Sequence, residues 1–355
     1  MRGRPDKVLI LGCGTIGQIK AGLWLSLGMD VYLYDTNPSQ VNKLLSTDER
    51  LKRFRQDKTN GFIVDISTPS DQHASSLQWV FEAIKNPRTV LVEKPICTNI
   101  SDKMAINRLL NKHRDVSIYV NESYFWSSAL DWLLNQLYVN NESLRSIEVS
   151  LSKNRLADTR AGRFFDRELE SYGIEMPHVI AILQKLGVDI SRLRVLANTL
   201  YRSDIDPLNQ GVNIELSDAN GSTIKIDSFL GNFMILESNR VPNCLARWLI
   251  VKTNKQNTYR ITFDPAPNER RFKSVVMIND DERIVLDDDH LRKHLQQVQF
   301  GEMSNAMKQY LSPANSIAIY DFLEKLYDSK IEDCISDTVV QNNEVGERVG
   351  VIQWH

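Results

Sequence analysis

At 355 residues, the chain is long enough for two domains with a large hydrophobic core. Hydrophobic residues make up 42% and charged residues 25%, as in ordinary globular proteins. The net charge of −2 gives no reason to expect binding to nucleic acid or to an anionic membrane. No apolar run has the length of a membrane span, and the one after Arg2 and Arg4 is too short for a signal peptide.

The cysteines are scattered and form no CxxC pair, which predicts free thiols in a reducing compartment and a cytoplasmic protein. They are Cys13, Cys97, Cys244 and Cys334. His290 and His294 are four residues apart but lack the glutamate of a zinc-protease motif, so no metal site is expected.

The first predicted elements surround a glycine-rich turn. An apolar strand at 8–11 leads directly into Gly12-Cys13-Gly14-Thr15-Ile16-Gly17, and a helical stretch follows. Such a turn lets a pyrophosphate approach Gly14 and the N-terminus of the helix, while Gly12 and Gly17 permit the tight turn and close packing. Thr15 and Ile16 open the helix beside the phosphates. The strand, the glycine turn and the helix together predict a dinucleotide site.

A second strand at 31–34 ends in Asp35, near the position of a carboxylate that binds the adenosine ribose hydroxyls. This carboxylate would repel a 2′-phosphate, and residues 36–38 contain no arginine to receive one. Lys43 could lie nearby. The sequence therefore favours NAD(H) over NADP(H).

Strands and helices continue to alternate up to residue 122, which predicts a doubly wound parallel sheet. The expected strands are 62–66, 89–92 and 116–120, and the expected helices are 71–86 and 101–113. Residues 1–122 are thus predicted to form a dinucleotide-binding Rossmann domain.

The rhythm changes in residues 123–330, where short turns join many strands. Helices are expected at 128–139, 175–186, 290–310 and 315–329, and strands at 145–151, 193–201, 211–217, 222–229, 245–252, 257–263, 273–278 and 283–286. This pattern predicts an α+β domain with an open, largely antiparallel sheet that binds substrate and mediates oligomerisation. A homodimer or homotetramer would cover its free face. Residues 331–355 form an extension without an assigned role.

Three more segments follow predicted parallel strands, where ligands bind in such sheets. They are Ser67-Thr68-Pro69-Ser70-Asp71-Gln72-His73, Glu93-Lys94-Pro95 and Asn121-Glu122-Ser123-Tyr124-Phe125. With the glycine turn and Asp35, they resemble the Gfo/Idh/MocA family of glucose–fructose oxidoreductases and inositol dehydrogenases. The resemblance implies NAD(P)-dependent redox chemistry at a carbon bearing oxygen, on a sugar, sugar derivative or (amino)cyclitol.

The resemblance also implies roles for particular residues in the first domain. Lys94 would be the active-site lysine, followed by a cis bond before Pro95. The cofactor would be bordered by Thr68, Pro69, His73, Glu93 and Asn121. His73 could equally orient its loop or cap the next helix.

In the second domain, the family has an Asp four residues before a His on one helix. Here Ile174 occupies the Asp position, and the acid is Glu175, three residues before His178. Both spacings place two side chains on one helix face. His178 is predicted to carry the proton, and Glu175 either to orient it or to bind substrate. Candidate substrate contacts are Tyr124, Tyr172 and the arginines Arg155, Arg160 and Arg163 of a polar stretch.

The expected reaction moves a hydride between a secondary alcohol and nicotinamide, with His178 and Lys94 acting on the hydroxyl. Two alternatives stay open: reduction of a ketone or imine with NAD(P)H, and a regulator that binds NAD(P) without catalysis. A small-molecule polyol is the expected substrate.

Overall fold

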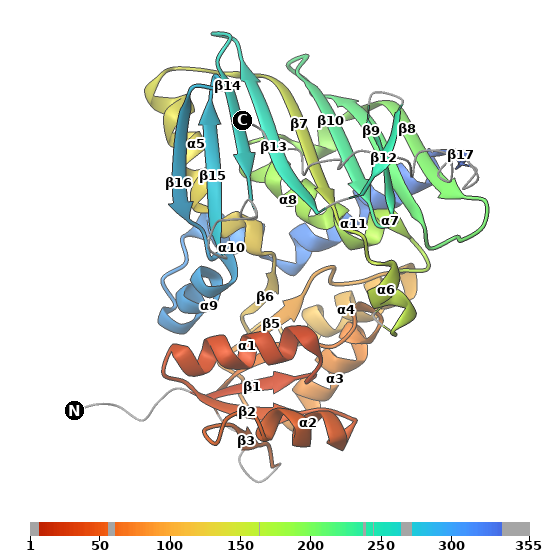
Figure 1. The fold of residues 1–355 in the computed structure, drawn as a ribbon. Helices are drawn as coiled ribbons and strands as arrows, with labels where there is room; N and C mark the ends of the chain where they lie inside the picture. The colour runs from red at the N-terminus through yellow and green to blue at the C-terminus, as the bar shows by residue number, and fades with distance from the viewer. Residues whose placement is uncertain are drawn as a thin grey trace. The chain divides into compact units, whose positions relative to one another are not determined.

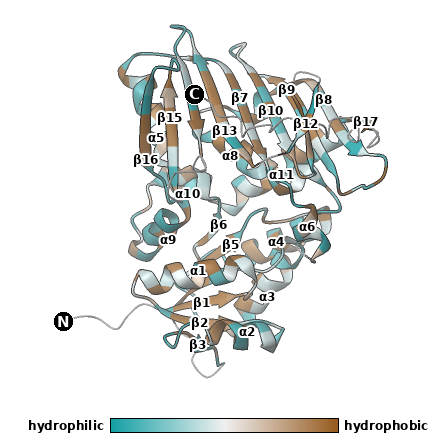
Figure 2. Ribbon diagram, in the orientation of Figure 1, coloured by the Kyte–Doolittle hydropathy of each residue, from teal (hydrophilic) through white to brown (hydrophobic). Residues whose placement is uncertain are grey.

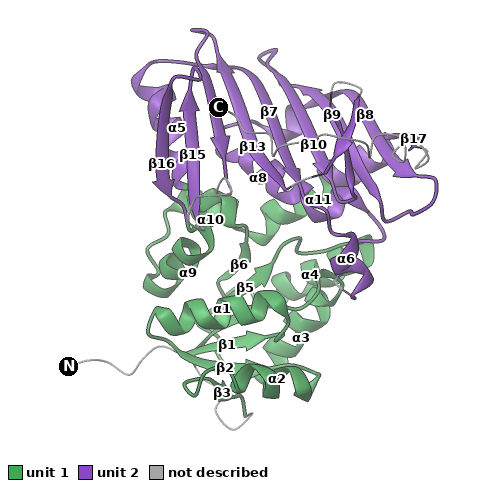
Figure 3. Cartoon of the chain, in the orientation of Figure 1, with its two compact units in different colours: residues 1–127, 289–321 green, residues 128–288, 322–355 purple. Residues whose placement is uncertain are grey.

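A computed structural model describes residues 7–55, 61–162, 164–236, 239–243, 245–263 and 272–335. The chain divides into two compact units (Figure 3). Unit 1 comprises residues 1–127 and 289–321, and unit 2 comprises residues 128–288 and 322–355. The first division thus falls five residues after the expected one at 122, and residues 289–321, expected in the second domain, belong to unit 1.

Unit 1 is built on a six-stranded parallel sheet in the order β3-β2-β1-β4-β5-β6 (Figure 1). Its strands are β1 (Lys7–Leu11), β2 (Asp30–Tyr34), β3 (Lys52–Arg53), β4 (Phe62–Ile66), β5 (Thr89–Glu93) and β6 (Ile118–Asn121). The predicted Rossmann sheet is confirmed. The order reverses between β1 and β4, so the loops after these two strands border the crevice where such folds bind ligands.

Four helices of unit 1 alternate with its strands, and two more come from residues 290–310, much later in the chain. They are α1 (Thr15–Ser26), α2 (Pro38–Leu45), α3 (His73–Ala83), α4 (Ile100–Lys112), α9 (His290–Phe300) and α10 (Asn305–Tyr310). Strand β1 is hydrophobic after its first residue, Lys7 (Figure 2), and Val8, Leu9 and Ile10 are fully buried. The expected helix at 290–310 is two helices, because Gly301 adopts a left-handed conformation (φ 71°) that ends α9.

Unit 2 contains a nine-stranded mixed sheet in the order β16-β15-β14-β13-β7-β10-β9-β8-β17. Its strands are β7 (Leu144–Ser152), β8 (Arg194–Ser203), β9 (Gln210–Ser217), β10 (Thr223–Phe229), β13 (Ala246–Thr253), β14 (Thr258–Thr262), β15 (Lys273–Ile278), β16 (Glu282–Asp287) and β17 (Ile331–Ile335). Only the pairs β7–β10 and β8–β17 are parallel. The expected largely antiparallel sheet is confirmed. The first residues of the predicted C-terminal extension form β17, the edge strand of this sheet.

One set of alternating side chains of this sheet is buried, as Ile147, Val149, Ile224 and Ile226 illustrate. Helices α5 (Ser128–Val139), α7 (Ser171–Ile174) and α8 (Met176–Lys185) pack against the sheet. Helix α6 (Leu156–Arg160) and the hairpin of β11 (Phe233–Leu236) and β12 (Asn239–Pro242) also belong to unit 2. Helix α11 (Pro313–Asp328) is divided between the units, with its residues up to 321 in unit 1 and the rest in unit 2. Within the described residues, no helix has the length and hydrophobicity needed to cross a membrane.

Candidate active site

The glycine turn has the geometry that the sequence predicts. Gly12 has a φ of 99°, and a Cβ placed on it would lie 2.8 Å from the backbone of Ser67. A Cβ on Gly17 would lie only 2.0 Å from the carbonyl oxygen of Gly12, so α1 can approach the strand only with glycine there. A Cβ on Gly14 would meet no atom within 4 Å. Space is therefore open at the point where α1 begins, with its unpaired N–H groups.

Asp35 follows β2 and lies beside this turn. Its carboxylate accepts hydrogen bonds from the backbone N–H of Cys13, at 2.7 Å, and from the backbone N–H of Asn37, at 2.8 Å. The side chain remains partly exposed. Burial, followed by the charge of Asp35, raises the pKa of the Cys13 thiol to about 12, so this thiol stays protonated at neutral pH. Asp35 thus presents a carboxylate at the rim of the glycine turn.

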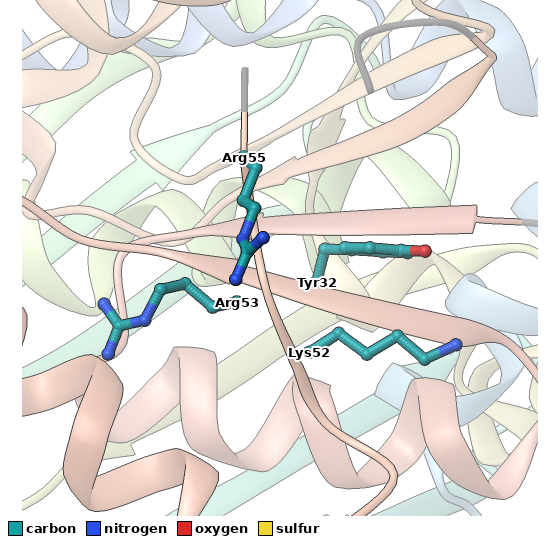
Figure 4. Close-up of a pocket in the computed structure, with 4 residues that line it drawn as sticks. All are labelled: Tyr32, Lys52, Arg53 and Arg55. Atoms are coloured by element: carbon teal, nitrogen blue, oxygen red, sulfur yellow. The ribbon is translucent and has the colours of Figure 1, made fainter. Parts of the chain in front are cut away.

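The structure brings a cation to this region from a strand that the sequence did not reveal. Strand β3 pairs with β2, and Arg53 on β3 donates to the side chain of Asn42. The charge of Arg53 also acts on Cys13, whose pKa it lowers against the larger effect of burial. With Tyr32, Lys52 and Arg55, it lines a hollow of about 250 Å³ (Figure 4). Residues 36–38 contain no arginine, but Arg53 is a cation near Asp35 that only the fold reveals.

His73 ties two of the predicted segments together. Its ring is fully buried, with Nδ1 2.9 Å from the carbonyl oxygen of Pro95 and Nε2 3.1 Å from that of Thr68. Burial lowers the pKa of His73, and the neutral ring donates to only one of these oxygens. Of the roles considered for this residue, loop orientation matches these contacts. Thr68 is half-buried and Pro69 is exposed at the start of the following turn.

The peptide bond between Lys94 and Pro95 is cis, as the resemblance implies. Lys94 directly follows β5 and is partly exposed. Glu93 Oε1 lies 2.5 Å from Lys20 Nζ and accepts a hydrogen bond from Asn121 Nδ2. The other amide atom, Asn121 Oδ1, is buried and makes no hydrogen bond to any described residue.

In unit 2, a buried carboxylate shapes the chain that leads to His178. Asp166 accepts hydrogen bonds from the backbone N–H groups of Glu168 and Leu169. Burial raises its pKa to about 6. A Cβ on Gly173 would lie 2.1 Å from Asp166 Oδ2, so only glycine lets the two segments meet. Helix α8 then begins after Glu175.

Glu175 and His178 occupy the start of α8, and Glu175 is almost fully buried. Its carboxylate forms an ion pair with Arg155 and lies 4.0 Å from Nη2 of Arg247 on β13. His178 donates its backbone N–H to the carbonyl oxygen of Glu175 and keeps its side chain partly exposed. Arg155 lies 20 residues before Glu175 in the chain, whereas Arg247 comes from a distant strand and could not be predicted from the sequence pattern.

The residues predicted to contact the substrate differ in burial and in their partners. Tyr172 is fully buried and its hydroxyl donates to Asn198 Oδ1 at 2.5 Å, so its place in a substrate pocket stays a prediction. Tyr124 is also buried, with its ring against His290 in unit 1. Arg160 is exposed and pairs with Asp206 at 2.5 Å. Arg163 lies outside the described residues.

The described residues contain no group of three or more His, Cys, Asp or Glu side chains arranged to hold a metal ion.

No protein-family model matches the chain, and no curated protein matches it in sequence. Solved structures do match it. A variant of KijD10, a 3-ketoreductase from Actinomadura kijaniata in complex with TDP-benzene and NADP, is 16% identical with a TM-score of 0.70, covering 94% of this chain and 100% of that one. A putative NADPH-dependent oxidoreductase from Desulfitobacterium hafniense is 14% identical with a TM-score of 0.69, covering 92% and 96%.

An oxidoreductase from Thermotoga maritima is 14% identical with a TM-score of 0.68, covering 92% of this chain and 97% of that one. At these identities, the similarity concerns the fold. The chain therefore has the two-domain fold of these oxidoreductases, with a Rossmann-type unit and a mixed, largely antiparallel second sheet.

Proposed function

We propose that this protein is an NAD-dependent oxidoreductase that acts on a secondary alcohol of a sugar, sugar derivative or (amino)cyclitol. The observation that carries the proposal is the open space at Gly14, bordered by the N-terminus of α1 and by the Asp35 carboxylate. A pyrophosphate fits beside such a helix terminus, and ribose hydroxyls can donate to such a carboxylate. Asn121 Oδ1, buried without a partner among the described residues, offers an acceptor for a carboxamide.

When bound, NAD⁺ accepts the hydride that the alcohol carbon gives up. His178 takes the hydroxyl proton on its imidazole and so acts as the general base. Lys94 donates a hydrogen bond to the same oxygen and stabilises the negative charge that develops there. These two residues belong to different units of the chain, so the proposal requires the units to bring them to one carbon.

In this proposal, Glu175 acts through His178 and not on the substrate itself. Arg155 and Arg247 fix its carboxylate at the start of α8, which gives His178 a rigid helix end from which to act.

Mixing the protein with NAD⁺ and a panel of sugars and cyclitols, while recording absorbance at 340 nm, tests the activity. A rise that depends on one substrate is the expected result. The reverse direction is the second candidate, since one of the similar structures is described as a 3-ketoreductase. Loss of absorbance with NADH and a keto-sugar identifies it. Tight NADH binding without turnover of any panel member in either direction would favour a non-catalytic regulator.

NAD(H) is the proposed cofactor because the Asp35 carboxylate repels a 2′-phosphate. The change Asp35→Asn removes that charge, so we expect it to weaken NADH binding about 10- to 100-fold and to improve NADPH binding. Fluorescence titrations of both cofactors measure the two dissociation constants. Arg53→Gln is the control, because it removes the nearby cation and should affect only NADPH. Tighter binding of NADPH than of NADH to the unmodified protein would contradict the assignment.

We also propose a homodimer or homotetramer formed through the free face of the nine-stranded sheet. That face carries ion pairs across strands, Lys225 with Glu215 at 3.3 Å and Lys252 with Glu148 at 3.6 Å, beside the partly exposed Trp248. Light scattering after size-exclusion chromatography is expected to give two or four times the monomer mass. The change Trp248→Glu should shift it toward monomer, and a monomer in the unmodified protein would refute the proposal.

A further inference from the structure

A lysine is fully buried in the middle of α1, next to the segment that carries Lys94. Lys20 Nζ lies 2.6 Å from Asp65 Oδ1 on β4 and 2.5 Å from Glu93 Oε1 on β5. The indole Nε1 of Trp24, one turn further along α1, donates to the other oxygen of Asp65 at 2.9 Å. A lysine is almost never fully buried unless it is paired, so this contact has a specific structural basis.

The charges of this cluster do not cancel. One ammonium faces two carboxylates, which leaves one negative charge in a buried place. Burial alone would lower the pKa of Lys20, but Asp65 and Glu93 raise it above its ordinary value. Burial would likewise raise the pKa of Glu93, but Lys20 and Asn121 lower it overall. Lys20 and Glu93 are therefore both charged at neutral pH.

Other titratable groups surround the cluster. Lys94, just after β5, and His73, at the start of α3, both interact electrostatically with Glu93. His294 on α9 is fully buried, and neither ring nitrogen has a hydrogen-bond partner among the described residues. Burial, with Lys20 as the next cause, lowers the pKa of His294 to about 3. His73 and His294 are thus neutral, and the charge on Glu93 depends chiefly on Lys20.

The two oxygens of Glu93 have different surroundings. Lys20 and Asn121 both bind Oε1, whereas no described residue hydrogen-bonds Oε2. The side chain keeps 14% of its surface exposed, although Lys20 and Asp65 have none. Glu93 therefore lies between the buried cluster and the protein surface, at the end of β5 and next to Lys94.

We propose that Lys20 is a positioning residue, which holds Glu93 ionised through Oε1 and so presents Oε2 to the nicotinamide ribose beside Lys94. This inference rests on the proposed function, because it assumes that the cofactor reaches Glu93. Without Lys20, Asp65 Oδ1 and Glu93 Oε1 would lie within about 5 Å of each other, since both now contact the same nitrogen. Two buried carboxylates at such a distance do not both stay ionised, so one would take up a proton at neutral pH.

The test is the pH dependence of NADH binding to the full chain, followed by fluorescence from mildly acidic to mildly alkaline pH. The unmodified protein should show no binding step from Glu93 in this range. The variant Lys20→Met should bind NADH about 10-fold more weakly at neutral pH, with affinity changing up to about tenfold per pH unit where the shared proton is lost. An unchanged pH profile in this variant would overturn the proposal.

Charge compensation separates this role from a merely structural one. The double variant Lys20→Met with Asp65→Asn again leaves one negative charge, on Glu93, and asparagine keeps an oxygen for Trp24. We expect it to recover the pH-independent binding that Lys20→Met loses. If Lys20 only fills space, the double variant should bind no better than the single one, and that result would also overturn the proposal.

Two further measurements keep the outcomes distinct. The first is the single variant Asp65→Asn, which retains Lys20, so its NADH binding should remain tight and independent of pH. This variant tests the inference even if Lys20→Met does not fold. A pH-dependent loss of NADH binding in Asp65→Asn would contradict the inference. Thermal unfolding of each variant reports folding. If the unmodified protein binds neither NADH nor NADPH, the proposed function fails. If it binds NADH and only the Lys20 series departs from expectation, the positioning role alone fails.

Discussion

Replacing Lys94 or His178 by alanine is expected to lower turnover about 100- to 10,000-fold while NADH binding is retained. General acid–base catalysis contributes rate factors of this size, and each residue is proposed to act on the reacting hydroxyl rather than on the cofactor. Both side chains are partly exposed, Lys94 after β5 and His178 at the start of α8. Their truncation should therefore leave the cores of both units intact.

The measurement is kcat with the substrate found in the absorbance screen, alongside NADH titration and thermal unfolding. Matched controls are Lys94→Arg, which keeps the positive charge, and His178→Gln, which keeps a hydrogen-bonding side chain but cannot carry a proton at neutral pH. Lys94→Arg should retain more activity than Lys94→Ala, and His178→Gln should be as slow as His178→Ala. Near-normal turnover in either alanine variant would remove that residue from the mechanism.

The sequence was sufficient for features that depend on neighbours along the chain. The glycine turn, the strand before it and Asp35 form one local unit, and a parallel sheet follows from alternating strands and helices. The same reasoning found most strands of the second sheet. It missed the short elements α2, β3, α6, α7, β11 and β12, whose few residues give little periodicity. It also missed the edge strand β17, which depends on pairing with distant β8.

The ionic contacts of the candidate site depend on tertiary structure and could not be found in this way. Lys20 follows the glycine turn in a largely apolar helix, and only the parallel order of β1, β4 and β5 brings Asp65 and Glu93 to it. Arg247 reaches Glu175 from a strand distant in the chain. A single sequence contains no pattern that links such pairs, because each depends on the register of several strands.

Tyr172 shows how little proximity along the chain says about the direction of a side chain. The residue lies close to His178 in the sequence, which suggested a place in the substrate pocket. Helix α7 instead turns its side chain into the core of unit 2, where burial raises the pKa of the phenol and Asn198 accepts its hydrogen bond. Proximity in sequence predicts a shared site only when the local structure points both side chains the same way.

Two glycines of the same turn are expected to fail in different ways, which separates the fold from its proposed use. In Gly17→Ala, the new Cβ would lie 2.0 Å from the carbonyl oxygen of Gly12, a rigid backbone atom. The helix α1 must then move away from β1, and we expect a loss of about 3 kcal/mol in the free energy of unfolding. Thermal and denaturant unfolding measure this loss.

In Gly14→Ala, the Cβ meets no atom within 4 Å and the backbone φ of −69° suits any residue. Stability should change by less than about 1 kcal/mol. The methyl group would, however, occupy the space through which a pyrophosphate approaches the turn, so NADH binding should weaken at least about 100-fold. A stable Gly14→Ala protein that binds NADH normally would place the cofactor elsewhere, whereas stability losses of equal size in both variants would show that Gly14 serves the fold.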